Sequence, residues 1–101
     1  MAADIYISEL LDRYGAILSE KQFRILDGYY NNDLSLSEIA ENEGITRQGV
    51  SDFVKRAEAQ LLDYEQKLGF NKKLSSLKSA VNRFRTGQCD IKELSDLIEK
   101  M

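Results

Sequence analysis

The stretch that decides the fold is Leu36-Ser-Glu-Ile-Ala-Glu-Asn-Glu-Gly-Ile-Thr-Arg-Gln-Gly-Val-Ser-Asp-Phe-Val-Lys55. Two segments with helical apolar spacing flank a glycine, which accepts the positive φ of a tight turn. A small residue on the first segment lets a second helix cross closely, and apolar residues lock the pair. The positions that fit this arrangement are Ile39, Ala40, Gly44, Ile45, Val50 and Phe53. The spacing predicts a helix-turn-helix over residues 36–55.

One position departs from the pattern, because Glu43 stands where this motif usually has an apolar residue. An ordinary helical hairpin with a glycine turn is the alternative interpretation. Six matches at fixed spacing favour the helix-turn-helix.

Helical spacing continues on both sides of this stretch, and the sequence contains no proline. Capping residues precede four of the predicted helices, at Ser19, Ser35, Thr46 and Asp90. Helix ends are predicted at Gly15, as a C-terminal stop, and at Gly44, Gly69 and Gly87, with a turn at residues 31–33. We predict helices over residues 4–14, 20–30, 36–43, 47–68 and 71–85, and a sixth from residue 91. The second is expected to bury Phe23, Leu26 and Tyr30.

Length and composition predict one folding unit with a C-terminal appendage, because 101 residues allow one modest core. We expect a helix-turn-helix domain over residues 1–69 and a helical extension over 70–101 that packs on it or dimerises. The apolar share of 43% and charged share of 31% are typical of a soluble protein. No apolar run approaches a membrane span, the N-terminus lacks the pattern of a secretory signal, and Cys89 is the single cysteine. A cytoplasmic location without membrane insertion is expected.

Charge is distributed unevenly along a chain whose net charge is −3. Residues 1–45 carry three basic and nine acidic side chains, whereas residues 69–101 carry seven basic and four acidic ones. A surface that binds anions is therefore expected in the second half.

The second helix of the motif offers side chains suited to nucleic acid. Arg47 and Gln48 suit guanine and adenine edges, and hydroxyl and lysine groups near the positive helix end suit phosphates. Asp52 opposes phosphate binding, and could accept from a cytosine amine or pair with Arg56. The candidate nucleic-acid-binding residues are Thr46, Arg47, Gln48, Ser51, Lys55 and Arg56, together with Lys72, Lys73, Lys78 and Arg83 of the fifth helix. A solvated face of mixed charge is the alternative for both groups.

Catalysis is not expected. The sequence has no histidine, one cysteine, and no glycine-rich phosphate loop. We therefore expect a non-enzymatic binding protein without a metal or cofactor.

The long helix carries apolar residues at intervals of four and three, the a/d rhythm of a coiled coil. These are Val50, Val54, Ala57, Leu61, Tyr64 and Leu68, and the last two helices repeat the rhythm at Leu74, Leu77, Val81 and Phe84 and at Ile91, Leu94, Ile98 and Met101. The partner of this seam could be the same chain or a second copy in a homodimer.

Several blocks resemble the YlxM-like family of bacterial helix-turn-helix proteins over about residues 5–69. They are Tyr14-Gly-Ala-Ile-Leu-Ser-Glu-Lys-Gln22, Tyr29-Tyr-Asn-Asn-Asp-Leu-Ser-Leu-Ser-Glu-Ile-Ala-Glu41, Thr46-Arg-Gln-Gly-Val-Ser-Asp52 and Leu62-Asp-Tyr-Glu-Gln-Lys-Leu-Gly69. The family's recognition segment usually reads Ser-Arg-Gln-Ala-Val-Tyr-Asp, so Thr46, Gly49 and Ser51 depart from it.

The resemblance implies an all-α fold with a three-helix, winged-helix-like core for DNA or RNA, of the type found in the promoter-reading C-terminal domain of sigma factors. A long fourth helix and a C-terminal helical hairpin follow that core. Family members are associated by gene neighbourhood with the signal recognition particle protein and its receptor. The implied function is a nucleic-acid-binding regulator in that pathway, with duplex DNA, the particle's RNA, the particle protein or its receptor as partner. The alternatives are a transcriptional regulator and a protein-interaction adaptor that uses the motif as a scaffold.

Overall fold

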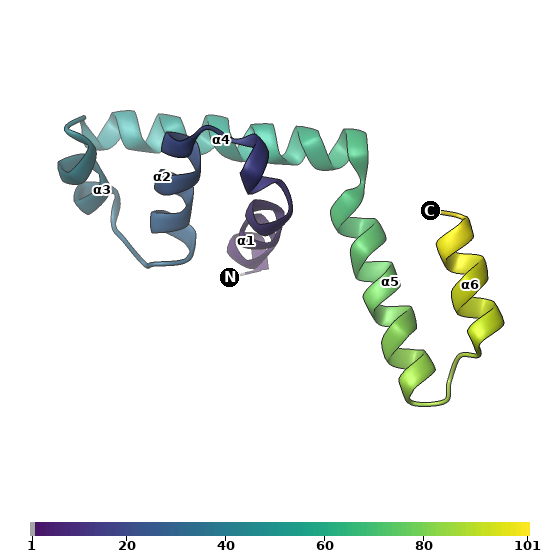
Figure 1. Cartoon of the computed structure of the whole chain (residues 1–101). Coiled ribbons are helices and arrows are strands. Elements are labelled where there is room, and N and C mark those ends of the chain that lie inside the picture. Colours follow the sequence, from purple (N-terminus) through teal and green to yellow (C-terminus); the bar gives the residue numbers. More distant parts are fainter. Residues whose placement is uncertain (1) are drawn as a thin grey trace. The chain divides into compact units, whose positions relative to one another are not determined.

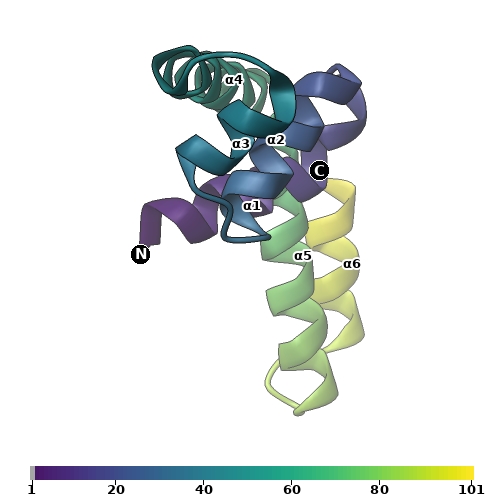
Figure 2. The ribbon, with the colours of Figure 1, turned by 90° about the vertical axis from the view of Figure 1, so that its left-hand side faces the viewer.

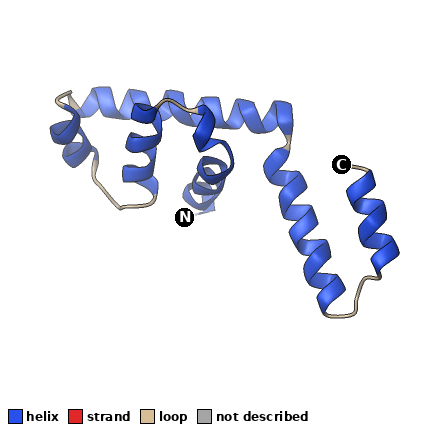
Figure 3. Cartoon of the chain, viewed as in Figure 1, coloured by secondary structure: helices blue, strands red, loops and turns tan. Residues whose placement is uncertain are grey.

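The computed structural model describes residues 2–101, with side chains from residue 5 onward, and this part of the chain consists of helices joined by loops, without strands (Figure 1, Figure 3). The elements are α1 (Ala2–Tyr14), the 3₁₀ turn η1 (Gly15–Ile17), α2 (Glu20–Tyr30), α3 (Leu36–Glu43), α4 (Arg47–Leu68), α5 (Phe70–Arg85) and α6 (Ile91–Glu99). The predicted all-α fold with a long fourth helix is confirmed. The chain divides into two compact units, one ending at Leu68 and the other beginning at Gly69.

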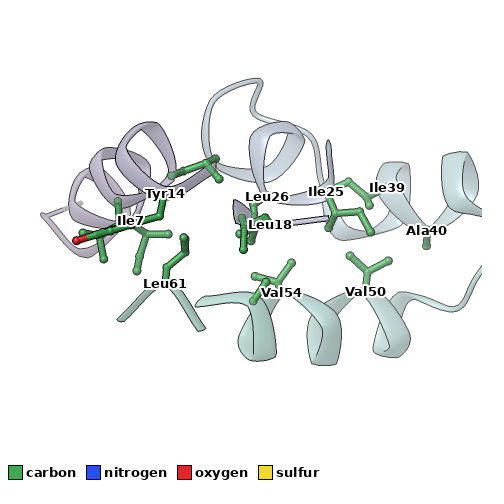
Figure 4. Close-up of a cluster of buried hydrophobic side chains, with 13 residues drawn as sticks. Ile7, Tyr14, Leu18, Ile25, Leu26, Ile39, Ala40, Val50, Val54 and Leu61 are labelled. Atoms are coloured by element: carbon green, nitrogen blue, oxygen red, sulfur yellow. The ribbon is translucent and has the colours of Figure 1, made fainter. Parts of the chain in front are cut away.

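The first unit is built on α4, which contacts α1, α2 and α3 (Figure 1). Figure 2 views α4 nearly end-on, with the three other helices beneath it. Val50, Val54, Ala57 and Leu61 share one face of α4 because of their spacing, and all four are buried. The rest of this core comes from the other helices and the segment after η1 (Figure 4): Ile7, Leu10, Leu11, Tyr14, Leu18, Ile25, Leu26, Ile39 and Ala40. One face of α4 therefore holds three shorter helices in a single core.

Side-chain caps fix where the helices begin. Ser19 and Ser35 each form the predicted capping box, with Gln22 and Glu38 respectively. The Thr46 hydroxyl accepts a hydrogen bond from the Gly49 backbone N–H at 3.0 Å, which caps α4 as predicted. The capping predictions are confirmed, including the cap at Asp90 for α6.

One prediction around α2 is wrong. Phe23 is 41% exposed rather than buried, and Ile25, which the sequence did not single out, lies in the core with Leu26. Tyr30 is partly buried, as it packs against the core. The helix stop at Gly15 is where the sequence predicted it, because α1 ends at Tyr14, and Gly15 then begins a 3₁₀ turn without a positive φ. Local packing explains the exposure of Phe23. Its ring lies against the backbone of Gly15, where a Cβ would be only 2.8 Å away, instead of entering the core.

The second unit is a hairpin of α5 and α6, which contact each other. Its buried residues are Asn71, Ala80 and Cys89, and burial raises the pKa of the Cys89 thiol. The heptad residues of this hairpin are half-buried or exposed. On α4 the seam is buried from Val50 to Leu61, whereas Leu68 is 54% exposed. The coiled-coil rhythm thus mixes core positions of the first unit with apolar side chains left at the surface.

We expect Leu61→Ala to destabilise the protein by about 2–5 kcal/mol, because Leu61 is fully buried and its loss leaves a cavity. Leu62→Ala is the matched control, since Leu62 is 46% exposed one position further on. Urea unfolding followed by circular dichroism measures both changes. Equal losses of stability in the two variants would contradict the assignment of the buried face of α4.

Candidate nucleic-acid interface

The helix-turn-helix consists of α3, a left-handed glycine and the start of α4. Gly44 has φ 68° and ψ 31°, which favours glycine, and its N–H closes the end of α3. Ile39, Ala40 and Val50 are buried at the crossing of the two helices, and Phe53 packs against them in part. Ile45 was also predicted to lock the pair but is 37% exposed. Its side chain lies over the first turn of α4, since its Cδ1 is 3.8 Å from the position a Cβ of Gly49 would occupy.

The unusual Glu43 has a specific partner. Arg24 of α2 donates from Nε and Nη2 to the two carboxylate oxygens of Glu43, each at 2.8 Å. The Glu43 side chain is only 13% exposed, so the fork of Arg24 replaces water around a nearly buried carboxylate. The Arg24 guanidinium holds the pKa of Glu43 below its ordinary value, mainly through the hydrogen bonds. An ion pair between α2 and α3 thus takes the place of the expected apolar contact.

The first three turns of α4 present four of the candidate residues to solvent. Arg47 and Gln48 are exposed in the first turn, and Lys55 and Arg56 are exposed further along. Arg47, half-buried Ser51 and Lys55 recur every four residues and so share one face of the helix. The positive end of the helix and the unpaired N–H groups of its first turn add to the attraction for anions.

Two candidate side chains are already engaged within α4. The Thr46 hydroxyl accepts from the Gly49 N–H, and this cap fixes the hydroxyl at the start of the helix while leaving its O–H as the donor for a phosphate. Gln48 donates from Nε2 to Asp52 Oδ1 at 3.0 Å, which gives Asp52 a partner that the sequence did not identify. This bond orients the Gln48 amide and leaves its carbonyl oxygen and second N–H for a ligand.

The remaining candidate cations belong to the second unit. Lys72, Lys73, Lys78 and Arg83 are all exposed on α5. Arg83 also borders a shallow depression of about 440 Å³ lined by Ser75, Ser76, Ser79 and Leu97. Hydroxyl groups beside a guanidinium are hydrogen-bond donors of the kind that contact phosphate.

Sequence reasoning missed a groove in the first unit. It has a volume of about 520 Å³ and is lined by Tyr6, Ile7, Tyr29, Tyr30, Leu36, Ser51, Val54, Lys55, Glu58 and Leu62. Tyr6 and Leu62 are 40% and 46% exposed, so the groove leaves apolar surface in water beside two of the candidate residues, Ser51 and Lys55. The adjacent aromatic residues Tyr29 and Tyr30 were the available signal; the sequence assigned Tyr30 to the core and Tyr29 no role beyond the family resemblance.

This geometry, with a glycine turn and an exposed start of the second helix, defines a helix-turn-helix protein. Residues 1–101 match the model of the family described as "Putative helix-turn-helix protein, YlxM / p13 like", and the chain belongs to this family. The predicted resemblance is confirmed, and the match extends beyond residues 5–69 to the whole chain.

Proteins of several bacteria are similar to this chain over about two thirds or more of its length. The UPF0122 proteins of Clostridium perfringens strain SM101 and Clostridium kluyveri are 50% and 53% identical over 68 residues, which is 67% of this chain and 61% of each relative. The UPF0122 protein of Thermoanaerobacter sp. strain X514 is 42% identical over 83 residues, covering 82% of this chain and 71% of that protein. The matched region thus spans about three fifths of the clostridial relatives.

No helix within residues 2–101 has the length and apolar character needed to cross a membrane. In the same range, histidine, cysteine, aspartate and glutamate side chains form no group of three that could hold a metal ion.

We expect Arg24→Ala to lower the melting temperature at neutral pH, because it leaves the Glu43 carboxylate nearly buried without its partner. The pKa of Glu43 is lowered in the folded protein, so the pair stabilises fully above the ordinary carboxylate pKa and loses its effect as pH falls through the lowered value. The difference in melting temperature between wild type and variant should therefore shrink in acid.

Thermal melts from neutral to acid pH measure this difference. Lys67→Ala is the control, because the Lys67–Asp63 pair is well exposed and its loss should have a smaller effect. A melting-temperature loss for Arg24→Ala that stays the same at every pH would show that the ion pair does not cause it.

Proposed function

We propose that this chain is a non-enzymatic, cytoplasmic regulator that binds nucleic acid through the start of α4 and acts in the signal recognition particle pathway. Membership of a helix-turn-helix family supports the nucleic-acid-binding role. The link to the particle comes from the gene neighbourhood of the family that the sequence resembles. The particle's RNA is therefore the first ligand to test, and duplex DNA is the second.

The observation that carries the proposal is the exposed first turn of α4 at the end of a rigid support. α3 and the Gly44 turn fix the direction of α4, and the core holds the helix from Val50 onward. Arg47, which lies one residue after the cap, is exposed at the positive end of the helix, where a phosphate or guanine can approach it.

Electrostatics decide how this surface would bind. Asp52 repels phosphate, but its hydrogen bond to Gln48 keeps one carboxylate oxygen occupied near the helix surface. Ser51 and Gly49 offer little area for stacking on a base. We therefore assign most of the affinity to contacts of Arg47, Lys55 and Arg56 with the phosphates of the nucleic acid, and less to base reading. A homodimer of the chain would present two copies of α4, as paired half-sites require.

The cations of α5 offer a second, sequence-independent contribution. Lys72, Lys73, Lys78 and Arg83 would neutralise phosphates and make binding salt-dependent. Their contribution and that of α4 can be separated by mutation because they belong to different units.

We expect Arg47→Glu to weaken binding roughly tenfold or more, because it removes a cation at the proposed contact and adds a repelling charge. Fluorescence-anisotropy titrations against signal recognition particle RNA and unrelated duplex DNA, each at two salt concentrations, measure the effect. Lys67→Glu makes the same charge change at the other end of α4 and should alter binding much less. If Arg47→Glu binds like wild type while joint substitution of Lys72, Lys73 and Arg83 abolishes binding, the role proposed for α4 is wrong.

The tyrosine-lined groove favours a second candidate function, that of a protein-interaction adaptor. Tyrosine provides much contact area at little entropic cost, and an exposed apolar groove is a common docking site for a helix. The lining residues of α4, from Ser51 to Leu62, extend over about three helical turns, which suits a short amphipathic helix. The signal recognition particle protein and its receptor are the partners to test.

We expect Leu62→Lys to weaken binding to the purified signal recognition particle protein and to leave RNA binding unchanged, because Leu62 lines the groove away from Arg47. Isothermal titration calorimetry measures the protein complex. Leu68→Lys is the control, since Leu68 is exposed on the same helix outside the groove. Equal affinity of wild type and Leu62→Lys would remove the groove from the proposed function.

A further inference from the structure

The hairpin of α5 and α6 leaves much of its apolar surface in water. The two helices run side by side (Figure 1, Figure 2), and each buries only part of its apolar stripe on the other. Val81, Phe84, Ile91, Ile98 and Met101 are 39%, 41%, 71%, 51% and 42% exposed. Two packed helices cover only the side of each that faces the other. Because the apolar stripe on each helix is wider than this contact, another element must pack on the rest of it.

The exposed and half-buried apolar residues of the hairpin follow the spacing of a helical bundle. On α5, Leu74, Leu77, Val81 and Phe84 recur at intervals of three and four residues. Ile91, Leu94 and Ile98 of α6 do the same, and Met101 continues the spacing just after the helix ends. This rhythm is the one that packs four helices around a shared core. The hairpin supplies two of the four helices.

Charge indicates which partner supplies the other two. α5 carries five basic and no acidic residues, whereas α6 carries three acidic residues and one basic residue. An α5 helix is therefore complementary to an α6 helix and repels another α5. A second hairpin of the same sequence offers both helices in the arrangement that this complementarity requires.

We propose that the exposed face of the hairpin, defined by Val81, Phe84, Ile91, Ile98 and Met101, binds the same face of a second copy of the chain. α5 of one copy packs against α6 of the other, so that each basic helix has acidic helices as its neighbours. The contact is isologous and closes at two copies, because each hairpin uses the whole face. This surface gives the homodimer named above its interface, and it does not depend on nucleic-acid binding.

The proposed dimer keeps part of the basic surface of α5 in solvent. Lys78 follows Leu77 and Arg85 follows Phe84, so these two cations border the apolar stripe. Lys72 and Arg83 are eleven residues apart, which places them together on a different face of the helix. Those two side chains stay accessible to phosphate in the dimer.

Sedimentation equilibrium of the full chain over a wide range of concentration, without nucleic acid, tests the proposal. We expect a reversible dimer, which Ile91→Lys and Ile98→Lys each weaken roughly tenfold or more because the symmetric contact contains every residue twice. Both residues are exposed, so the variants should keep their helix content by circular dichroism. Ile17→Lys is the matched control, since Ile17 is 56% exposed on η1 of the first unit.

Lys78→Glu tests the arrangement of the helices. If α5 packs against α6 of the second copy, this charge reversal weakens the dimer, whereas a tighter dimer would mean that the basic helices pack together. A wild-type chain that stays monomeric at every concentration, or a dimer that Ile91→Lys and Ile98→Lys leave unchanged, would overturn the proposal. Neither result bears on the role of Arg47, which is measured separately with nucleic acid.

Discussion

The burial of one face of α4 is the constraint on which the first unit depends. Val50, Val54, Ala57 and Leu61 are each at most 5% exposed, and they form the surface on which α1, α2 and α3 assemble. Because the same helix begins at the Gly44 turn, burial of its middle also fixes the direction of its exposed first turn. Stability and the proposed binding surface therefore share one element, and a cavity under α4 would disturb both.

Polar contacts then determine how the short helices are placed on this core. The pair formed by Arg24 and Glu43 joins α2 to α3 at a position where apolar packing was expected. The Tyr14 hydroxyl donates to Glu65 at 2.6 Å, which ties the end of α1 to the later part of α4. Charged-group hydrogen bonds of this kind are stronger than neutral ones and depend on direction, so they favour a single arrangement of helices.

Local rules predicted the helices, their caps and the buried face of α4, since spacing and capping chemistry act within a few residues. Long-range packing was harder to predict. Nothing near Phe23 in the sequence indicates that its ring would lie over Gly15 at the surface. Glu43 departs from the apolar pattern of the motif, and only the structure shows that Arg24 binds it there. The groove combines residues of four helices, and the exposed face of the hairpin is visible only when each side chain's burial is known. For the candidate nucleic-acid contacts, the residue types on α4 and their exposure could be predicted from the sequence. The hydrogen bond between Gln48 and Asp52 could not.

Binding of nucleic acid to the exposed start of α4 is the central proposal; the hairpin is a separate surface, and the groove adjoins this contact at Ser51 and Lys55. An amide NMR titration of the full chain with a short duplex DNA and with a hairpin of the signal recognition particle RNA tests it most directly. We predict that one of these ligands shifts the amide resonances of Arg47, Gln48 and Ser51, and that added salt reverses the shifts. Shifts confined to α5, or none with either ligand, would contradict it.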